Sequence, residues 1–356
     1  MTSKPPFGGE AVRLNQLCSK GKSNLRQKDI ENDGPFNVYG ASGIVGRMDT
    51  YQNERPYVGI VKDGAGVGRA MLCEGKTSVL GTMQALLPNE GTNLSYLLHL
   101  VRSLKLGENY SGSTIPHIYF KDYGRQEVPA LSAGQQSAIA ERLDLAEQLM
   151  ALIDDETAKL DSLVKSRFVE MFGDPVENPM GWPCEKLGDL GELKNGVNFK
   201  AADSGCEIKC LGVSDFKNRY SVSNMDLIST VTLNGEPTEK QMLRDGDVVF
   251  VRSNGNKQLV GRCLAVFPGD ARLTFSGFCI RFRNESDSLL LDYLLVCLKS
   301  DSMRKAMSGR GANIQNLSQG LLSKVDVPLP PLELQSEFAD FTARVDKLRF
   351  VVFGGP

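Results

Sequence analysis

Two stretches of the chain, Ile115–Ala140 (IPHIYFKDYGRQEVPALSAGQQSAIA) and Ile314–Ala339 (IQNLSQGLLSKVDVPLPPLELQSEFA), match each other at a constant offset of 199 residues. Val128-Pro129 of the first stretch aligns with Val327-Pro328 of the second. Self-similarity at a fixed long period indicates that one structural module is used twice. The period is too long for a solenoid repeat, so we expect two globular modules.

The similarity extends upstream of these stretches. Gly68-Arg69 matches Gly261-Arg262, and the tyrosine of Tyr96-Leu-Leu matches Tyr293. The offset falls to 193 and 197 at these points, which indicates small loop insertions. The order of features is the same in both halves.

Each module has a mixed pattern of strands and helices. Tyr57–Val61 and Asp247–Val251 are rich in β-branched and aromatic residues, which predicts strands. Each runs through a polar, glycine-containing turn into a second predicted strand, ending at Cys73 and Val266. The runs 96–104 and 289–298 have the length and apolar spacing of helices. The pattern therefore predicts α+β modules.

The segment between the modules predicts one long helix. From Ser132 to Gly173 the only helix-breaking residue is Gly134. At about 1.5 Å per residue, the helix would be roughly 55 Å long. Its apolar positions alternate steps of four and three, which is a heptad seam: Ile139, Leu143, Ala146, Met150, Ile153, Leu160 and Val164, with Thr157 completing the register.

The tail of the chain predicts a second helix of the same kind. Its apolar residues follow the same spacing: Leu334, Phe338, Phe341, Val345 and Leu348. A long helix with one apolar stripe needs a partner. We expect the two helices to pair antiparallel and hold the modules apart; the alternative is that each helix packs on its own module.

Length and composition exclude several classes of protein. The 356 residues suggest two or three domains, and no run of about 18 apolar residues predicts a membrane span. The eight cysteines show no metal-binding spacing, so we expect reduced, mostly buried thiols, as in a cytoplasmic protein. Only two histidines are present: His99 in an apolar run, expected to be buried, and His117 in a polar loop, expected at the surface.

The charge is distributed unevenly along the chain. The net charge is −2. Residues 1–130 carry 15 basic and 12 acidic residues (net +3), and residues 182–330 carry 19 and 17 (net +2). Residues 131–181 carry 4 basic and 10 acidic residues, a net of −6. Net acidity disfavours nucleic-acid binding, but local basic faces on the modules would permit it.

Three motifs together resemble the specificity subunit of a type I restriction-modification system. The first is LVKSRFVEMFGDP at 163–175, followed by NPMGWP at 178–183. The second is VPLPPLELQ at 327–335, and the third its weaker copy VPALSAGQQ at 128–136. The resemblance covers essentially the whole chain, in the order module, helix, module, helix.

This resemblance implies a fold and a set of domains. The fold class is α+β, with two repeated globular target-recognition domains separated by long helices that form an antiparallel coiled coil. The expected boundaries are 1–130 and 175–330 for the two recognition domains, with helices at 131–174 and 331–356. By the repeat offset, Phe350 corresponds to Ala151, so residues 152–172 have no second copy and we expect a shortened helical pair.

The resemblance also implies a function. Each module would recognise one half of a bipartite sequence in double-stranded DNA. The helices would space the modules and dock two modification subunits, which methylate adenine with S-adenosylmethionine; a restriction subunit completes the complex. The chain itself would bind no cofactor or metal and contribute no catalytic residue, and the shortened helix leaves self-association through the helices open.

Candidate DNA contacts lie in loops of both modules. Lys and Arg in such loops bind phosphates or guanine edges, and Asn pairs with adenine. In the first module the candidates are Lys62, Arg69, Ser113 and Thr114; in the second they are Arg252, Lys257, Arg262, Arg310 and Asn313. An ordinary solvated turn is the alternative for each loop.

The glycine-rich segment Asp63–Gly68 is similar to a nucleotide-binding loop, but the strand predicted after it disfavours that reading.

Two other functions of the chain remain open. One is a stand-alone DNA-modifying enzyme, which the scarcity of histidine disfavours. The other is a coiled-coil scaffold with protein-binding modules, which would show no salt-dependent binding to DNA.

Overall fold

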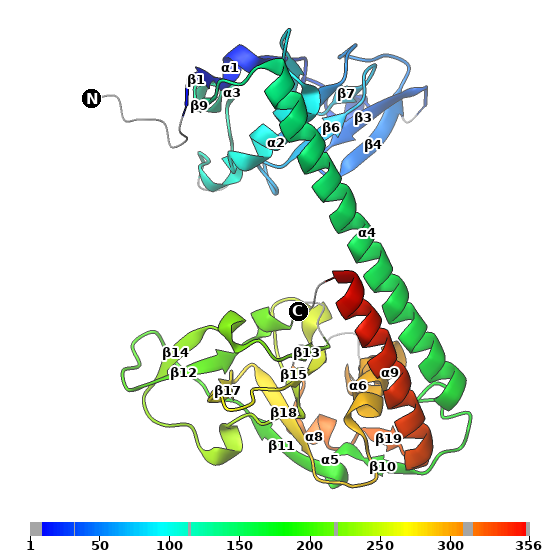
Figure 1. The fold of residues 1–356 in the computed structure, drawn as a ribbon. Coiled ribbons are helices and arrows are strands. Elements are labelled where there is room, and N and C mark those ends of the chain that lie inside the picture. Colours follow the sequence, from blue (N-terminus) through cyan, green and yellow to red (C-terminus); the bar gives the residue numbers. More distant parts are fainter. Residues whose placement is uncertain (1–8, 32, 113–114, 217–219, 309–315, 354–356) are drawn as a thin grey trace. The chain divides into compact units, whose positions relative to one another are not determined.

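The computed structural model describes residues 9–31, 33–112, 115–216, 220–308 and 316–353. The chain divides into two compact units, Met1–Leu152 (unit 1) and Ile153–Pro356 (unit 2). The boundary falls inside one continuous helix, α4 (Ala133–Phe172), so unit 1 holds its first half and unit 2 its second half (Figure 1).

Unit 1 combines small β-sheets with short helices. Its strands are β1 (Ala11–Arg13), β2 (Cys18–Lys20), β3 (Phe36–Gly40), β4 (Gly43–Met48), β5 (Tyr57–Val61), β6 (Ala70–Cys73), β7 (Ser78–Val79), β8 (Met83–Pro88) and β9 (Glu127–Pro129). Its helices before α4 are α1 (Leu14–Leu17), η1 (Gln27–Asp29), α2 (Leu94–Ser103), η2 (Leu106–Glu108) and α3 (Phe120–Tyr123).

Unit 2 contains a similar set of elements. Its strands are β10 (Cys184–Lys186), β11 (Gly191–Asn195), β12 (Cys206–Leu211), β13 (Ser221–Val222), β14 (Thr230–Leu233), β15 (Asp247–Val251), β16 (Cys263–Val266), β17 (Leu273–Phe275), β18 (Cys279–Asn284) and β19 (Asp326–Pro328). Its helices are α5 (Leu187–Leu190), η3 (Val213–Asp215), η4 (Met225–Leu227), η5 (Glu239–Gln241), η6 (Lys257–Leu259), α6 (Leu291–Lys299), α7 (Asp301–Ser308), α8 (Gln319–Leu322) and α9 (Leu332–Phe353).

The sheets of the two units have the same topology. Unit 1 has the order β2-β8-β5-β6, and unit 2 has β11-β18-β15-β16 with β13 added at the edge. A three-stranded sheet accompanies each, β4-β3-β7 and β14-β12-β17. A two-stranded ribbon also recurs, β1-β9 and β10-β19, and its second strand contains the repeated Val-Pro pair. The sequence repeat therefore corresponds to a structural repeat.

The central strands explain why the repeat was visible in the sequence. All five residues of β5 and all five of β15 are buried. A strand buried on both sides needs a continuous run of apolar, mostly β-branched residues. Both strands begin and end where the sequence predicted them.

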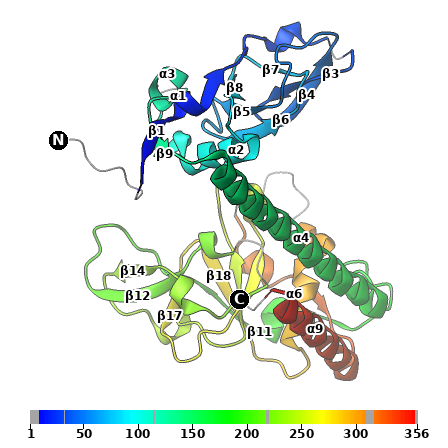
Figure 2. The same ribbon diagram turned by 45° about the horizontal axis from the view of Figure 1, so that its top comes forward.

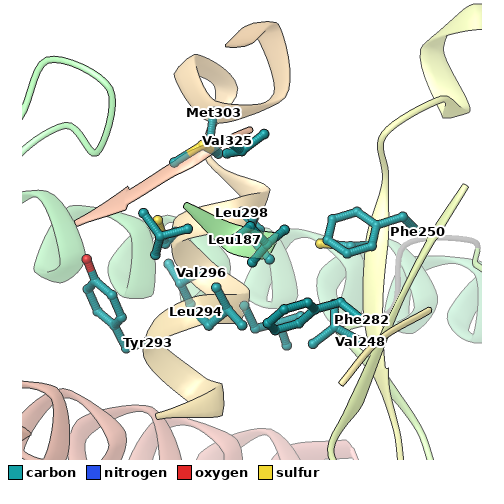
Figure 3. Packing of buried hydrophobic residues seen from close by; sticks show 14 of the residues in the cluster. Leu187, Val248, Phe250, Phe282, Tyr293, Leu294, Val296, Leu298, Met303 and Val325 are labelled. Carbon is teal, nitrogen blue, oxygen red and sulfur yellow. The ribbon is translucent and has the colours of Figure 1, made fainter. Parts of the chain in front are cut away.

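Helix α6 supplies much of the core of unit 2. Its residues Tyr293, Leu294 and Leu298 are fully buried and lie in one cluster with Phe250 and Phe282 of the sheet (Figure 3). Burying such side chains stabilises a fold by about 1.5–3 kcal/mol each. The helix is thereby fixed on one face of its sheet.

In unit 2, α9 runs antiparallel to the second half of α4 (Figures 1 and 2). Arg349 near the end of α9 bonds to Asp161, whereas Glu337 near its start accepts a 2.9 Å hydrogen bond from Arg167. Phe338 contacts Phe168, with their ring centroids 5.5 Å apart. The predicted antiparallel pairing is therefore confirmed, and it involves the part of α4 that has no second copy in the repeat.

The alternative, that each helix packs on its own module, also holds for α9 here, and the end of α4 packs on this same second module. Four aromatic side chains, which we call the aromatic anchor, join α4 and α9 to α6: Phe168, Phe172, Tyr293 and Phe338. Their ring centroids lie 4.9–5.5 Å apart, within the range of favourable aromatic contacts. All four side chains are buried.

In unit 1, α4 is joined to α2 by polar groups, which we call the polar anchor: Ser95, His99, Arg102, Asp144 and Glu147. The Ser95 hydroxyl donates to Asp144 at 2.6 Å, and His99 Nε2 lies 2.7 Å from the same oxygen. Arg102 donates to Glu147 at 2.7 Å. His99 is buried and hydrogen-bonded, as expected.

The first half of α4 leaves much of its predicted seam in water. Leu143 and Met150 are 41% and 65% exposed, and Ile153, at the start of the second half, is 41% exposed. The buried positions of the first half are Gln136 and Ala140, in its first two turns. Leu348 of the predicted α9 seam is also exposed, at 53%. Periodicity alone therefore located the helices and, in unit 2, their buried face, but it did not show that the seam of the first half of α4 stays in water.

Two equivalent glutamines fix the starts of the long helices. Gln136 Oε1 accepts from Asn93 N at 2.9 Å, and Gln335 Oε1 accepts from Leu290 N at 2.8 Å. Asn93 and Leu290 are the N-caps of α2 and α6. The matched glutamines in the sequence repeat thus make the same contact in both units.

Other expectations can be compared directly with the structure. Six of the eight cysteines are buried and all eight are free thiols; Cys184 is exposed and Cys206 is half-buried. Helix α9 spans Leu332–Phe353, within the expected range 331–356. None of the helices in the described part of the chain combines the length and apolar character needed to span a bilayer.

Candidate nucleic-acid interface

In unit 1, three segments that are distant in sequence meet at the end of β5. Lys62 N donates to Thr82 O at 3.0 Å, just before β8 begins. Ile118 N donates to Lys62 O at 2.9 Å, and Gly64 N donates to Pro116 O at 3.0 Å. The glycine-rich loop and the segment 115–118 therefore form one surface.

Unit 2 builds the same surface with the same hydrogen bonds. Arg252 N donates to Phe278 O at 2.8 Å, and Leu317 N donates to Arg252 O at 2.7 Å. Ser253 and Asn316 form an isolated antiparallel bridge, as Asp63 and His117 do in unit 1. The two surfaces are therefore equivalent in backbone and differ in side chains.

The hydrogen bonds pair the positions of the two units one by one. Lys62 corresponds to Arg252, Asp63 to Ser253, Arg69 to Arg262, Thr82 to Phe278 and His117 to Asn316. The sequence alone aligned the pairs 62/252 and 63/253, which follow the matched strands, as well as 69/262 and, through the 199-residue offset, 117/316. The pair 82/278 needed the hydrogen-bonded framework.

The predicted DNA contacts fall into two groups. Within the described residues, Lys62, Arg252 and Arg262 are half-buried at the base of these surfaces, and Arg69 and Lys257 are exposed. Ser113, Thr114, Arg310 and Asn313 lie outside the described residues, so their proposed role stays a prediction. Arg252 Nη1 also donates to Gly277 O at 3.4 Å and supports the turn before β18.

The glycine-rich loop of unit 1 has a specific backbone requirement. Gly64, Gly66 and Gly68 have φ values of +83°, +87° and +84°, which glycine adopts without strain. A Cβ on Gly66 would collide with the Arg69 guanidinium, and one on Gly68 with the backbone at Gly107. Strand β6 follows the loop, as predicted, so no helix N-terminus faces a phosphate there.

His117 has a partner that the sequence did not indicate. Its Nδ1 lies 2.7 Å from Asp63 Oδ1, and its ring stacks near Tyr119 with centroids 6.3 Å apart. The expected surface histidine is therefore half-buried and paired with a carboxylate. Asp63 and His117 come from two loops that are far apart in the sequence, so no local sequence pattern identifies this pair.

A hollow of about 540 Å³ lies in the equivalent place in unit 2. Its lining includes Ser253, Asn254, Lys257, Phe278 and Asn316. The ring of Phe278 is 60% exposed, although its neighbours on both sides in the turn are buried. Neutral polar groups, a lysine and an exposed aromatic ring form a surface suited to nucleotides rather than to acid–base catalysis.

The ionisable groups of the core do not form a reactive centre. Burial raises the pKa of Cys18 and Cys210 to about 12 and that of Cys263 to about 11, so these thiols stay protonated near neutral pH. Within the described residues, no three His, Cys, Asp or Glu side chains gather in a way that could hold a metal ion.

One buried lysine behaves differently from the other basic residues. Lys299 Nζ lies 3.7 Å from the ring centroid of Tyr220, and burial lowers its pKa to about 8. The Arg349 guanidinium lies 5.5 Å from the centroid of the same ring. These cation–π contacts join α6 and α9 to the loop before β13 and belong to the support of the module rather than to its candidate interface.

A family model for the type I restriction modification DNA specificity domain matches residues 8–162 and 179–350. The type I restriction enzyme StySPI specificity subunit of Salmonella potsdam is 25% identical over 291 residues, which cover 74% of this chain and 60% of that protein. The MjaVIII specificity subunit of Methanocaldococcus jannaschii is 24% identical over 379 residues, covering 96% and 87%.

A solved structure shows the same fold. The crystal structure of the type I restriction-modification S subunit from M. genitalium superposes with a TM-score of 0.56 at 14% identity. The match covers 99% of this chain and 93% of that chain. The chain thus spans nearly the whole of this structure but 60% of the Salmonella relative.

Proposed function

The chain belongs to the type I restriction modification DNA specificity family, and on that premise we propose that it is the DNA sequence-recognition subunit of a type I restriction-modification complex. Each module recognises one half of a bipartite target in double-stranded DNA. The observation that carries this proposal is the equivalent surface in both units, which keeps the backbone hydrogen bonds and changes the side chains. Two copies of one framework with different side chains suit the recognition of two different half-sites.

The proposed domains follow the sequence boundaries. Residues 1–130 and 175–330 form the recognition domains, and residues 131–174 and 331–356 form the helices that space them. The basic candidates Lys62, Arg69, Arg252, Lys257 and Arg262 bind phosphates or guanine edges, together with Ser113, Thr114, Arg310 and Asn313.

The partners of the chain are double-stranded DNA and the modification subunits, two per complex, with a restriction subunit in the full assembly. The chain supplies recognition and no catalysis; methyl transfer from S-adenosylmethionine takes place on the modification subunits. The exposed apolar side chains of α4 support docking there, because Leu145, Leu149 and Leu152 are 56%, 51% and 60% exposed. The acidic charge of residues 131–181 keeps this helix away from DNA phosphates.

The decisive experiment is to co-express the chain with the modification subunit from its own locus and to map methylated adenines across the host genome. We expect a two-part motif with a fixed spacer. A symmetric motif would indicate that two copies of the chain assemble. If no new methylation appears, binding of the lone chain to duplex DNA separates failed docking from a wrong assignment.

The salt dependence of DNA binding provides an independent check. Each released counterion contributes to the slope of log affinity against log salt, so several phosphate contacts lower affinity by orders of magnitude between 50 and about 200 mM salt. Arg69→Ala should reduce this slope by about one and affect only the first half-site. If the chain binds a protein partner, and neither salt nor competing duplex DNA changes that binding, a protein-binding scaffold is favoured instead.

A further inference from the structure

The hollow of unit 2 is bordered by an aromatic ring and by amide side chains. Phe278 forms one side, and Asn254 and Asn316 lie among the other lining residues. Single exposed apolar residues are common on protein surfaces and need no special explanation. Here, however, the ring shares one hollow on the candidate DNA surface with these amides.

The backbone fixes the position of Phe278. Gly277 N donates to Val197 O at 2.6 Å, and Phe278 O accepts from Arg252 N at 2.8 Å. A Cβ on Gly277 would collide with Asn198 Oδ1, so a larger residue there would have to displace that side chain. The ring is therefore presented to solvent from a rigid turn, and binding through it loses little conformational entropy.

The amide of Asn316 lies across the same framework. The backbone of Asn316 bridges to Ser253, which sets it beside the end of β15. Asn316 is exposed, and its side chain makes no hydrogen bond to any residue in the described part of the chain. Asn254 Oδ1 accepts from Asn256 N at 2.8 Å, so its amide already supports the loop. Asn316 is thus the better placed of the two amides to bind a ligand.

The first unit carries different chemistry at the equivalent positions. Thr82 takes the place of Phe278, and a carboxylate–imidazole pair, Asp63 and His117, takes the place of Ser253 and Asn316. The Nδ1–Oδ1 distance of 2.7 Å means that these two groups satisfy each other. The apolar ring and the amide are therefore features of unit 2 rather than requirements of the shared framework.

The base edges of DNA suggest what this combination recognises. In the major groove, the thymine methyl is the apolar group, and adenine presents the N6 donor and N7 acceptor that an asparagine amide matches. Both groups belong to one base pair. An exposed ring and an asparagine that line one hollow are therefore complementary to an A·T pair and offer no comparable match to G·C.

We infer that Phe278 and Asn316 together recognise an A·T base pair in the half-site bound by the second module. The ring packs against the thymine methyl, and the amide bonds to adenine N6 and N7. This inference rests on the proposed function. Arg252 is a positioning residue in this arrangement, because its backbone and its guanidinium both hold the Phe278 turn.

The test uses the full chain in complex with its modification subunit and duplexes that carry the mapped motif. Each thymine of the second half-site is replaced in turn by deoxyuridine, which lacks the methyl group. We expect one position to lower affinity about fourfold, the worth of one buried methyl group. In Phe278→Ala, thymine and deoxyuridine at that position should bind equally well.

The amide is tested in the same way with 7-deazaadenine, which lacks the N7 acceptor, opposite that thymine. We expect the wild-type complex to lose roughly fivefold or more, within the range of a broken bidentate contact. Asn316→Ala should bind the two duplexes alike. Phe267→Ala is the matched control, since Phe267 is an exposed aromatic residue of the same module and does not line the hollow; it should keep both penalties.

The outcomes separate this inference from the proposed function. A second half-site without an A·T pair, or a deoxyuridine penalty that persists in Phe278→Ala, overturns the inference and leaves the recognition function intact. Equal binding of thymine and deoxyuridine at every position by the wild-type complex does the same. Absence of any sequence-specific methylation or binding overturns the proposed function, and the inference with it.

Discussion

The long helix α4 is held in unit 1 by the polar anchor and in unit 2 by the aromatic anchor. The equivalent helices α2 and α6 make these contacts. The equivalent glutamines Gln136 and Gln335 each accept a hydrogen bond from the main-chain N–H of the N-cap residue of one of these helices. The polar anchor consists of hydrogen bonds and an ion pair, partly exposed to water. The aromatic anchor consists of four buried rings. One topology is thus stabilised by interactions that respond differently to pH, salt and mutation.

The physical reason for the difference is the number of helices that meet. In unit 2, α9 lies beside α4, so the side chains between α4, α9 and α6 are shielded from water. In unit 1, the side chains of Asp144 and Glu147 are 42% and 54% exposed, so the polar anchor remains in contact with water. Exposed ion pairs contribute about 0–1 kcal/mol, whereas large buried rings contribute several times more. Four predictions test this comparison.

The largest effect is expected from Phe338→Ala. This change removes a fully buried ring that contacts Phe168 and Phe172, and should destabilise unit 2 by about 3–5 kcal/mol. Hydrogen exchange of the α6 amides measures the loss, with the α2 amides as an internal reference. Leu348→Ala on the same helix, at a 53% exposed side chain, should change stability by less than about 0.5 kcal/mol. Equal effects of the two changes would mean that α9 is not anchored through Phe338.

Substitution of the equivalent glutamines, Gln335 and Gln136, should have the next largest effect on stability. Gln335→Ala leaves Leu290 N, Ser288 O and Pro330 O without their side-chain partner, at a cost on the order of 1–3 kcal/mol. Gln136→Ala removes the partner of two main-chain groups, Asn93 N and Leu131 O. Chemical denaturation followed by hydrogen exchange in each unit compares the losses. A larger loss for Gln136→Ala would contradict the comparison.

The equivalent tyrosines should respond in opposite directions. The Tyr293 hydroxyl donates to Pro328 O at 2.9 Å, so Tyr293→Phe should destabilise unit 2 by about 1 kcal/mol. The buried Tyr96 hydroxyl has no hydrogen-bond partner among the described residues, so Tyr96→Phe should be neutral or slightly stabilising. Thermal unfolding of the two single variants decides between these outcomes, and each is the other's control.

The smallest effect concerns pH. The Ser95 hydroxyl and the His99 ring hold the pKa of the Asp144 carboxyl below its usual value of 3.8. A lowered carboxyl pKa stabilises the fold above the unfolded-state value, and this contribution disappears as the pH falls through the folded-state value. Protection of the α2 amides should therefore decrease below about pH 4 in the wild type, and less so in Asp144→Asn. Protection of α6 should show no such difference between the two proteins.

Much of the fold followed from the sequence because its signals are local or repeated. The strands Tyr57–Val61 and Asp247–Val251 have the continuous apolar run of a buried strand. The helix from Ala133 to Phe172 lacks breaking residues after Gly134. The 199-residue offset paired Gln136 with Gln335 before their equivalent contacts were visible.

The candidate interface could be predicted from the sequence only in part. Charge and glycine content pointed to the loops that carry Lys62, Arg69, Arg252 and Lys257. They did not indicate that Asp63 bonds to His117, or that Phe278 and Asn316 line one hollow. These partners come from segments about 40–60 residues apart, and no local periodicity connects them.

The sequence by itself determined that the chain contains one module twice, with a long helix after each copy, because repetition and helical periodicity are properties of residue order. Only the tertiary structure decided along which part of each helix the apolar stripe is buried and which side chains share a surface. An apolar stripe with heptad spacing can be buried only where a partner lies against it. Leu160 and Val164 of α4 have that partner in α9, whereas Leu143 and Met150 remain in water.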